Sequence, residues 1–271
     1  MTTPNTTAAT PVLLARGISM SYGSIKVLQD VAIDVHAGRT HAVIGPNGAG
    51  KTTLFKVLSG EVLPDAGSVT FLGQQCERLD AWQRVRLGMG RTFQVARVFA
   101  ETTVLQNMVV AVEARALQSH SKHNQPAASR SNMPRMAPTQ IVLEEAQSAL
   151  AAMGLSGLWD TRAGVLAYGD RKRLELALAL ALAPQLLLLD EPMAGMSPAD
   201  RSAAVKTIQD VVRQRGISVL LTEHDMQVVF ALADHVTVLH HGQVLASGTP
   251  QAVRDLAEVR AVYLGEETAH A

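Results

Sequence analysis

GPNGAGKT, at residues 45–52, fits the pattern G-x-x-x-x-G-K-[ST] of a phosphate-binding loop. It follows the apolar run 42–44 and precedes the helix-compatible stretch 54–58, which is the strand–loop–helix context that the pattern requires. The glycines let successive backbone N–H groups curl around an anion, and the N-terminus of the following helix adds its positive dipole end. The stretch therefore predicts a phosphate site, although a glycine-rich turn with an exposed lysine is the alternative until a second signal is found.

Two side chains at the end of this loop have expected roles. Lys51 would contact the β- and γ-phosphates of ATP, and Thr52 would offer its hydroxyl to Mg²⁺. We therefore expect ATP and Mg²⁺ as cofactors and place Lys51 among the catalytic residues. The ATP-binding residues predicted from this segment are Gly45, Pro46, Asn47, Gly48, Ala49, Gly50, Lys51, Thr52 and Thr53.

The second signal is a fully apolar strand, 186–189, that ends in the carboxylates Asp190 and Glu191. The carboxyl end of a parallel strand is where open α/β sheets bind ligands. Asp190 would hold Mg²⁺ directly or through water, and Glu191 would polarise the attacking water as general base. Two surface acids in a turn are the alternative, and the phosphate loop in the same chain argues against it.

His224 follows another apolar strand, 219–221, through Thr222-Glu223. A contact with the γ-phosphate from this position would orient the attacking water and sense hydrolysis. A lone histidine at a strand end is more often a structural hydrogen-bonding residue. Together with the other motifs, His224 is predicted to be catalytic beside Glu191.

The bulk composition excludes several classes of function. Lys+Arg and Asp+Glu both number 24, so the formal net charge is zero and no global basic field would gather nucleic acid. The most apolar stretch, 174–189, is interrupted by Glu175, Pro184 and Gln185, well short of a spanning helix. The single Cys76 and a start unlike a signal peptide indicate a reducing compartment. Any membrane role would then come through a partner.

Strands and helices alternate along the chain. Short β-rich runs are expected at 13–18, 31–35, 41–44 and 69–72, helices within 81–183, and apolar strands again at 186–189 and 219–222. The runs 236–239 and 244–246 are joined by His241-Gly242, which is typical of a tight hairpin turn. Apolar strands alternating with helices predict an α/β fold with a mostly parallel sheet covered on both faces.

With these motifs in hand, the chain resembles the ATPase family of ABC transporters from about Leu13 to Leu264. The resemblance implies an α/β P-loop NTPase cassette with a RecA-like mixed-sheet core, an antiparallel β subdomain and a helical subdomain. It also assigns Tyr22 to stacking on adenine, and Gln94 to linking the Mg²⁺ and water site with the membrane subunit. Both residues join the predicted ATP-binding set, and Gln94 joins Thr52 and Asp190 as a predicted metal ligand.

The implied domain boundaries follow the same resemblance. They are a disordered tail at 1–11, an ATP-binding core with the β subdomain at 12–94 and 184–250, a helical subdomain at 95–183 with a flexible loop at 118–138, and a C-terminal helix and tail at 251–271.

Leu166-Ala167-Tyr168-Gly169-Asp170 resembles the family's signature LSGGQ, which binds ATP held by the opposite subunit. Ala167 stands where the family usually has serine, and Asp170 where it has glutamine. Gly169 and the N–H groups of a helix N-terminus remain, so phosphate binding there is still expected. Ser197 likewise stands where the family's D-loop usually has aspartate.

EPMAG at 191–195, RTFQ at 91–94 and VYLGE at 262–266 resemble ATPase subunits of branched-chain amino acid importers. The resemblance implies a Mg²⁺-dependent ATPase that powers uptake of a small solute, branched-chain or other amino acids. Its partners would be two transmembrane permease subunits, a second ATPase cassette that is identical or paralogous and, indirectly, a substrate-binding protein, without nucleic acid. The chain would work peripherally at the cytoplasmic face of the inner (plasma) membrane.

Three other functions stay open at this point. The ATPase of a lipopolysaccharide-type exporter has motifs close to these. Soluble ABC ATPases of translation or DNA repair commonly carry two cassettes in tandem or a long coiled-coil insertion, and they favour basic surfaces. This chain has one cassette, a short insert and no net charge. A non-catalytic regulator conflicts with the intact Lys51, Asp190, Glu191 and His224, although Ala167 and Ser197 would suit it.

Overall fold

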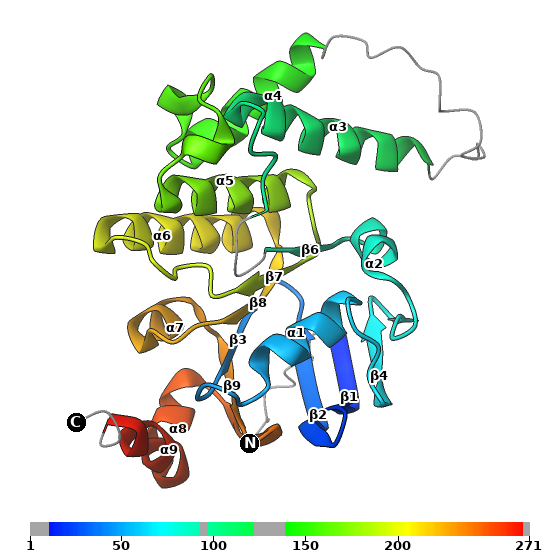
Figure 1. Cartoon of the computed structure of the whole chain (residues 1–271), viewed down its shortest axis with the longest axis vertical. Coiled ribbons are helices and arrows are strands. Elements are labelled where there is room, and N and C mark those ends of the chain that lie inside the picture. The colour runs from blue at the N-terminus through cyan, green and yellow to red at the C-terminus, as the bar shows by residue number, and fades with distance from the viewer. Residues whose placement is uncertain (1–10, 93–96, 122–138, 268–271) are drawn as a thin grey trace, which may run out of the picture. The chain divides into compact units, whose positions relative to one another are not determined.

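The fold is taken from a computed structural model, which describes residues 11–92, 97–121 and 139–267 (Figure 1). The chain divides into two compact units. The first comprises Met1–Arg91, Gln185–Pro192 and Ile208–Ala271, and the second comprises Thr92–Pro184 and Met193–Thr207. Residues 193–207, which the sequence analysis placed in the core, thus group with the helical residues.

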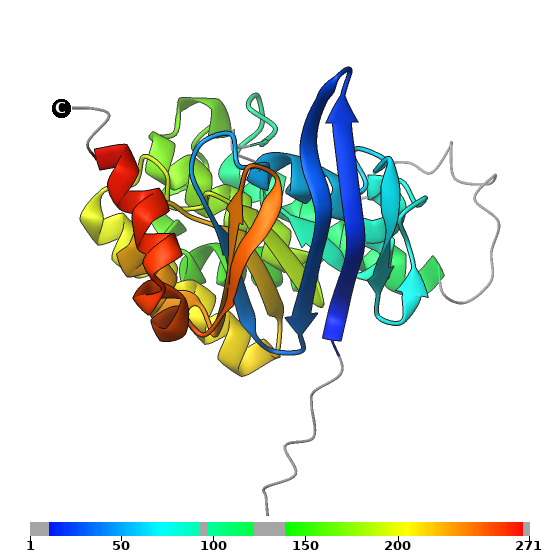
Figure 2. The ribbon, with the colours of Figure 1, turned by 90° about the horizontal axis from the view of Figure 1, so that it is seen from below.

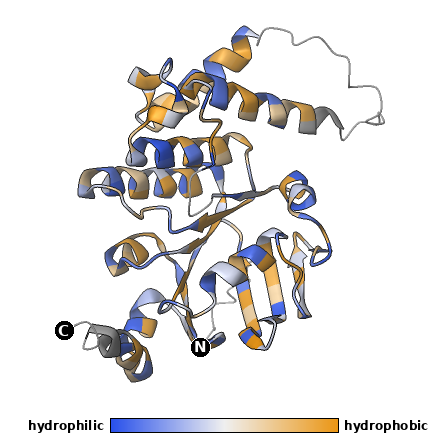
Figure 3. Cartoon of the chain, viewed as in Figure 1, coloured by the Kyte–Doolittle hydropathy of each residue, from blue (hydrophilic) through white to orange (hydrophobic). Residues whose placement is uncertain are grey.

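An antiparallel sheet occupies the first part of unit one. Its strands are ordered β2 (Ile25–His36), β1 (Pro11–Tyr22), β4 (Ala66–Phe71) and β5 (Gln74–Gln75). β1 and β2 form the long hairpin that Figure 2 shows from below, and both strands carry hydrophobic as well as polar residues (Figure 3). The buried side chains Leu13, Ala15, Ile18 and Met20 come from one face of β1, with a register shift between Ala15 and Ile18.

β1 is longer than the expected strand at 13–18. Pro11, predicted to end a disordered tail, opens β1 opposite His36. A proline is tolerated at the first position of a strand because no ladder hydrogen bond from its nitrogen is required there. The rest of the predicted tail, residues 1–10, lies outside the described part of the chain.

A second, mostly parallel sheet carries the strands on which the motifs lie. Its order is β10 (Gln243–Gly248), β9 (His235–His240), β3 (Thr40–Ile44), β8 (Ser218–Thr222), β7 (Leu186–Asp190) and β6 (Met89–Arg91). Every residue of β3, β7 and β8 is buried, as expected for central parallel strands. The predicted α/β fold with a mostly parallel sheet is confirmed.

The hairpin turn predicted at His241-Gly242 is also confirmed. It joins the antiparallel pair β9 and β10, and both turn residues have positive φ, 47° and 77°. These angles suit the primed turns that match the twist of paired strands.

Five helices and part of a sixth complete the described portion of unit one. They are α1 (Lys51–Ser59), α2 (Ala81–Leu87), α7 (Met226–Leu232), α8 (Pro250–Asp255) and α9 (Ala257–Glu267), and α6 (Pro198–Arg215) contributes its residues from Ile208 onward. Leu54, Phe55 and Leu58 of α1 are fully buried in one apolar cluster with residues of both sheets, including Phe71 and Leu188. The sequence predicts one C-terminal helix after residue 250, and the described residues there form two, α8 and α9.

The described part of unit two is helical. It contains α3 (Val104–Ser121), α4 (Gln140–Ala152), α5 (Tyr168–Ala181), short 3₁₀ turns at Ser156–Leu158 and Ala163–Val165, and the first residues of α6. α3 continues to Ser121, so the first residues of the loop predicted at 118–138 are helical, and residues 122–138 lie outside the description. No helix in the described ranges is long and apolar enough to cross a membrane.

Candidate functional site

The loop between β3 and α1 requires glycine for steric reasons. Gly45 has a φ of 149°, and a Cβ there would lie 2.1 Å from the carbonyl oxygen of Leu239. Gly50 has a φ of 102°, and a Cβ there would come within 2.8 Å of Leu28 and of the Val27 carbonyl oxygen. The motif therefore folds as a tight turn that other residues would disrupt.

The same loop presents groups that suit a phosphate. α1 begins at Lys51 with Gly50 as its N-cap, so no side chain caps the N–H groups of its first turn. These N–H groups and the helix dipole favour an anion. The Lys51 ammonium donates hydrogen bonds to the carbonyl oxygens of Gly45 (2.6 Å) and Pro46 (2.9 Å). These bonds tie the start of the loop to the lysine at its end. The arrangement fits the phosphates of a nucleotide.

Asp190 ends β7 with its carboxylate held from two sides. The Thr222 hydroxyl donates to Asp190 Oδ1 at 2.9 Å, and Arg91 Nη2 lies 3.6 Å from Asp190 Oδ2. Arg91 is itself paired with Glu61 and donates to the Ser59 hydroxyl at the end of α1. The carboxylate is therefore held between Arg91 of β6 and Thr222 of β8, the two strands that flank β7.

Glu191 has an unusual backbone and a direct contact with His224. Its φ is 48°, in the left-handed region that a non-glycine residue adopts at a cost. Its N–H donates to both the carbonyl oxygen (3.2 Å) and the hydroxyl (3.0 Å) of Thr222. Its Oε1 accepts a hydrogen bond from His224 Nε2 at 2.6 Å, so the histidine orients the carboxylate. Such a base held by a second group is the usual arrangement for activating a nucleophile.

Strand order brings these residues to one edge of the parallel sheet. Thr222 in β8 lies opposite Val43 of β3 on one side and opposite Asp190 of β7 on the other. The segments that leave the carboxyl ends of β3, β7 and β8 carry the phosphate loop, the carboxylate pair and His224, respectively. Since ligands bind at this edge in open α/β sheets, the arrangement is that of a nucleotide site.

The donors near Asp190 suit Mg²⁺ better than a metal held by protein ligands alone. No group of three or more His, Cys, Asp or Glu side chains able to hold a metal occurs among the described residues. Mg²⁺ typically takes one or two carboxylates and keeps waters and substrate phosphates as its other ligands. Asp190 and the exposed Thr52 at the start of α1 fit that mode. Gln94, the third predicted ligand, lies outside the described residues.

Tyr22, predicted to stack on adenine, ends β1 opposite Ile25. The residue is about half exposed, with 47% of its surface open to solvent. A flat, exposed aromatic ring at a strand end has the geometry for stacking on a base, and that role stays a prediction.

The signature residues form the start of α5 in unit two. Ala167 is the N-cap without a side-chain hydrogen bond, so the N–H groups of the first turn have no side-chain cap. Tyr168 packs on Gly195, where a Cβ would lie 2.8 Å from its ring. Asp170 forms an ion pair with Arg173 and does not cap the helix N-terminus. The site keeps backbone donors although the usual serine is missing.

Ser197 has a structural role in place of the usual aspartate. Its hydroxyl donates to Asp200 Oδ2 at 2.7 Å and accepts from the Asp200 N–H at 3.2 Å. These bonds cap α6, which begins at Pro198.

Sequence reasoning missed Thr222 and Arg91. Thr222 is the only polar residue between the apolar β8 core and Glu223, a signal that was available. Arg91 was noted only as part of the RTFQ motif. Its contact with Asp190 could not be predicted, because it depends on β6 and β7 being neighbours in the sheet.

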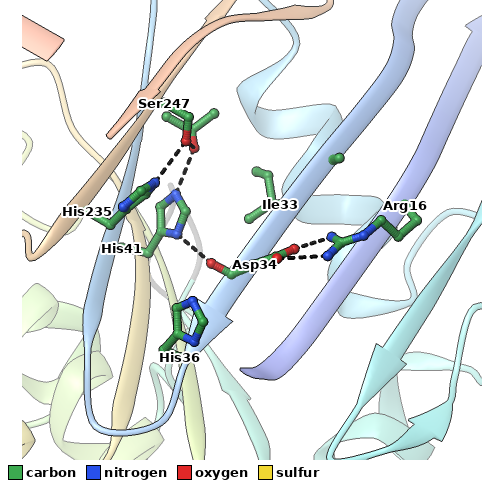
Figure 4. A pocket seen from close by; sticks show the side chains of 9 residues that line it. Arg16, Ile33, Asp34, His36, His41, His235 and Ser247 are labelled. Carbon is green, nitrogen blue, oxygen red and sulfur yellow. Dashed lines mark hydrogen bonds and ion pairs between the residues drawn. The ribbon is translucent and has the colours of Figure 1, made fainter. Parts of the chain in front are cut away.

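A separate cavity of about 310 Å³ lies at the other end of β3 (Figure 4). Its lining residues are Arg16, Ala32, Ile33, Asp34, His36, His41, His235, Thr237 and Ser247. Burial, and then the neighbouring His235, lowers the pKa of His41 to about 4. Because the Asp34 carbonyl oxygen can only accept, neutral His41 donates through Nδ1 and accepts at Nε2 from the Thr237 hydroxyl, both at 2.9 Å.

Comparisons with known proteins agree with the fold. The family model described as ABC transporter matches residues 28–194. The chain is 36% identical over 259 residues to the high-affinity branched-chain amino acid transport ATP-binding protein BraF of Pseudomonas aeruginosa, covering 94% of this chain and 98% of that one. It is 33% identical over 256 residues to the lipopolysaccharide export system ATP-binding protein LptB of Acidithiobacillus ferridurans, with 94% and 98% covered.

A solved structure has the same fold. The ADP conformation of MJ1267, an ATP-binding cassette of an ABC transporter, matches with a TM-score of 0.77 and 29% identity, covering 94% of this chain and 99% of that chain. The match extends over both units of the chain. This chain belongs to the ABC transporter family, as an ATP-binding subunit that hydrolyses ATP.

Proposed function

We propose that this chain powers the import of branched-chain or other amino acids through partner permease subunits. The supporting observation is its identity of 36% with BraF, a branched-chain amino acid transport protein, over 94% of this chain. Cassettes of this family pair and work with membrane permeases. In the same proposal, two permease subunits hold the chain peripherally at the cytoplasmic face of the membrane. A second cassette, identical or paralogous, pairs with the chain, and a substrate-binding protein delivers the solute to the permease.

Nucleotide binding rests on the loop and its helix. In this proposal the backbone N–H groups of residues 45–53, except the proline at 46, surround the phosphates. Lys51 neutralises the β- and γ-phosphates, and the Tyr22 ring stacks on adenine. Asp190 and Thr52, with Gln94, hold Mg²⁺, which when bound neutralises developing charge on the phosphate oxygens. The signature residues 166–170 of the partner cassette complete the site with backbone donors.

Hydrolysis rests on the contact between Glu191 and His224. The His224 N–H holds Glu191 Oε1 at 2.6 Å. The second carboxylate oxygen, Oε2, then accepts the proton of the attacking water, and the imidazole keeps the carboxylate in one orientation. Only 18% of the Glu191 side chain is exposed, so the base works partly shielded from competing solvent.

The import proposal is tested in cells of the source organism. A strain that lacks this chain should lose uptake of radiolabelled leucine, isoleucine or valine. Wild-type chain should restore uptake, and Glu191→Gln, expressed at the same level, should not. Unchanged uptake of every amino acid tested in the deletion strain would contradict the proposal.

The second candidate is the ATPase of a lipopolysaccharide-type exporter. The observation that favours it is the 33% identity to LptB over 94% of this chain. In that case the deletion strain would keep amino acid uptake and instead accumulate lipopolysaccharide at the inner membrane. The same strain therefore separates the two functions.

A further inference from the structure

Thr222 lies at the centre of the predicted catalytic residues although no motif contains it. It is the last residue of β8, and none of its surface is exposed. Its hydroxyl donates to Asp190 Oδ1 at 2.9 Å and accepts from the Glu191 N–H at 3.0 Å. One hydroxyl group therefore contacts both members of the carboxylate pair at the end of β7.

The direction of these bonds is fixed by chemistry. A threonine hydroxyl has one hydrogen, and a backbone N–H can only donate. The hydroxyl lone pair must therefore accept from Glu191, and its hydrogen is given to the Asp190 carboxylate. A hydrogen bond to an ionised group is stronger than one between neutral groups, so this hydrogen fixes the rotation of the carboxylate.

The backbone of Glu191 depends on the same residue. Its φ of 48° lies in the left-handed region, which an L-residue other than glycine adopts at a cost in free energy. The Glu191 N–H is held by two acceptors, the carbonyl oxygen and the hydroxyl of Thr222. Thr222 thus stabilises the turn that points the Glu191 side chain to His224, 2.6 Å away.

We propose that Thr222 is a positioning residue for ATP hydrolysis, whose hydroxyl sets the Asp190 carboxylate and the Glu191 backbone in one arrangement. The inference rests on the proposed roles of Asp190 and Glu191. It assigns no contact between Thr222 and ATP. Loss of the hydroxyl should therefore reduce turnover and leave nucleotide affinity nearly unchanged.

The test compares Thr222→Val, which keeps the shape and removes the hydroxyl, with Thr222→Ser, which keeps the hydroxyl. Thr237→Val is the matched control. Thr237 lies in β9 of the same sheet and is only 1% exposed, and its hydroxyl also makes two hydrogen bonds, at the separate cavity. Steady-state ATP hydrolysis, ATP affinity, thermal unfolding and the hydrogen-exchange rate of the Glu191 amide are measured for each variant, with wild type and Glu191→Gln alongside.

For Thr222→Val we expect kcat to fall roughly 10- to 100-fold, with KM for ATP within about threefold of wild type. The Glu191 amide should exchange faster, Thr222→Ser should restore most of kcat, and Thr237→Val should keep the wild-type kcat. Wild-type turnover in Thr222→Val, equal loss in Thr222→Val and Thr222→Ser, or the same loss in Thr237→Val would each overturn the inference.

Three further outcomes are assigned in advance. If Thr222→Val does not fold, Thr222→Cys replaces it, because cysteine is similar in size to serine but its thiol donates only weakly. The kcat of Thr222→Cys should then lie well below that of Thr222→Ser. Equal kcat values for these two variants would overturn the inference. If Glu191→Gln keeps wild-type turnover, the base assignment of the proposed function is wrong. If Glu191→Gln is inactive while Thr222→Val is fully active, only the role of Thr222 is wrong.

Discussion

At the scale of single residues, Glu191 combines a left-handed backbone with a hydrogen bond to His224. We predict that Glu191→Gln binds ATP and pairs with a partner cassette as wild type does, because the amide keeps the shape of the carboxylate. Its turnover should fall by about 10²–10⁴-fold, the range of a general base. The measurement is Mg²⁺-dependent ATP hydrolysis over a series of protein concentrations.

Glu101→Gln makes the same chemical change where 90% of the side chain is exposed, and it serves as the control. It should leave turnover unchanged. Normal hydrolysis by Glu191→Gln would show that another group accepts the proton.

At the scale of elements, the β9–β10 turn is tightly packed against β2. Gly242 has a φ of 77°, and a Cβ there would lie 2.4 Å from the Val27 carbonyl oxygen. Gly242→Ala should therefore lower the free energy of unfolding by about 3 kcal/mol, through backbone strain and a forced shift of the hairpin. Urea denaturation measures the loss.

Gly23→Ala separates the two causes. Gly23 has a φ of 62° but nothing within 4 Å of an added Cβ, so only the backbone cost of about 1 kcal/mol applies. If both variants lose the same stability, the contact with Val27 contributes nothing.

The sequence was sufficient for elements with strong local signals. The phosphate loop and the His241-Gly242 turn were predicted because glycine at positive φ leaves a clear pattern. The full length of β1 was missed because its outer residues, such as Pro11 and Tyr22, are held by pairing with β2 and not by their own composition. Contacts such as Thr222 with Asp190 need the strand order, which no local pattern contains.

At the scale of the whole molecule, His41 should make stability depend on pH. Its pKa is about 4 in the folded protein against 6.5 as the ordinary value, because it is buried and faces His235, with His36, Asp34 and Arg16 also lining the cavity. The unfolded chain therefore binds a proton that the folded chain does not. This stability is complete above pH 6.5 and is lost as pH falls toward 4, by about 3 kcal/mol.

Denaturation at a series of pH values measures this effect. His41→Gln can still donate to the Asp34 carbonyl oxygen and accept from Thr237, and it does not titrate. Its unfolding free energy should lose the His41 part of the slope between pH 6.5 and 4. An unchanged slope in His41→Gln would show that other groups cause it.

The left-handed backbone of Glu191 matters to anyone who selects variants of this protein by heat resistance. Glycine adopts that conformation freely, so Glu191→Gly relieves strain in the resting protein while it removes the carboxylate. Thermal selection and selection for turnover therefore favour different residues at this one position. A library screened by heat resistance alone would therefore enrich variants that bind ATP and do not hydrolyse it.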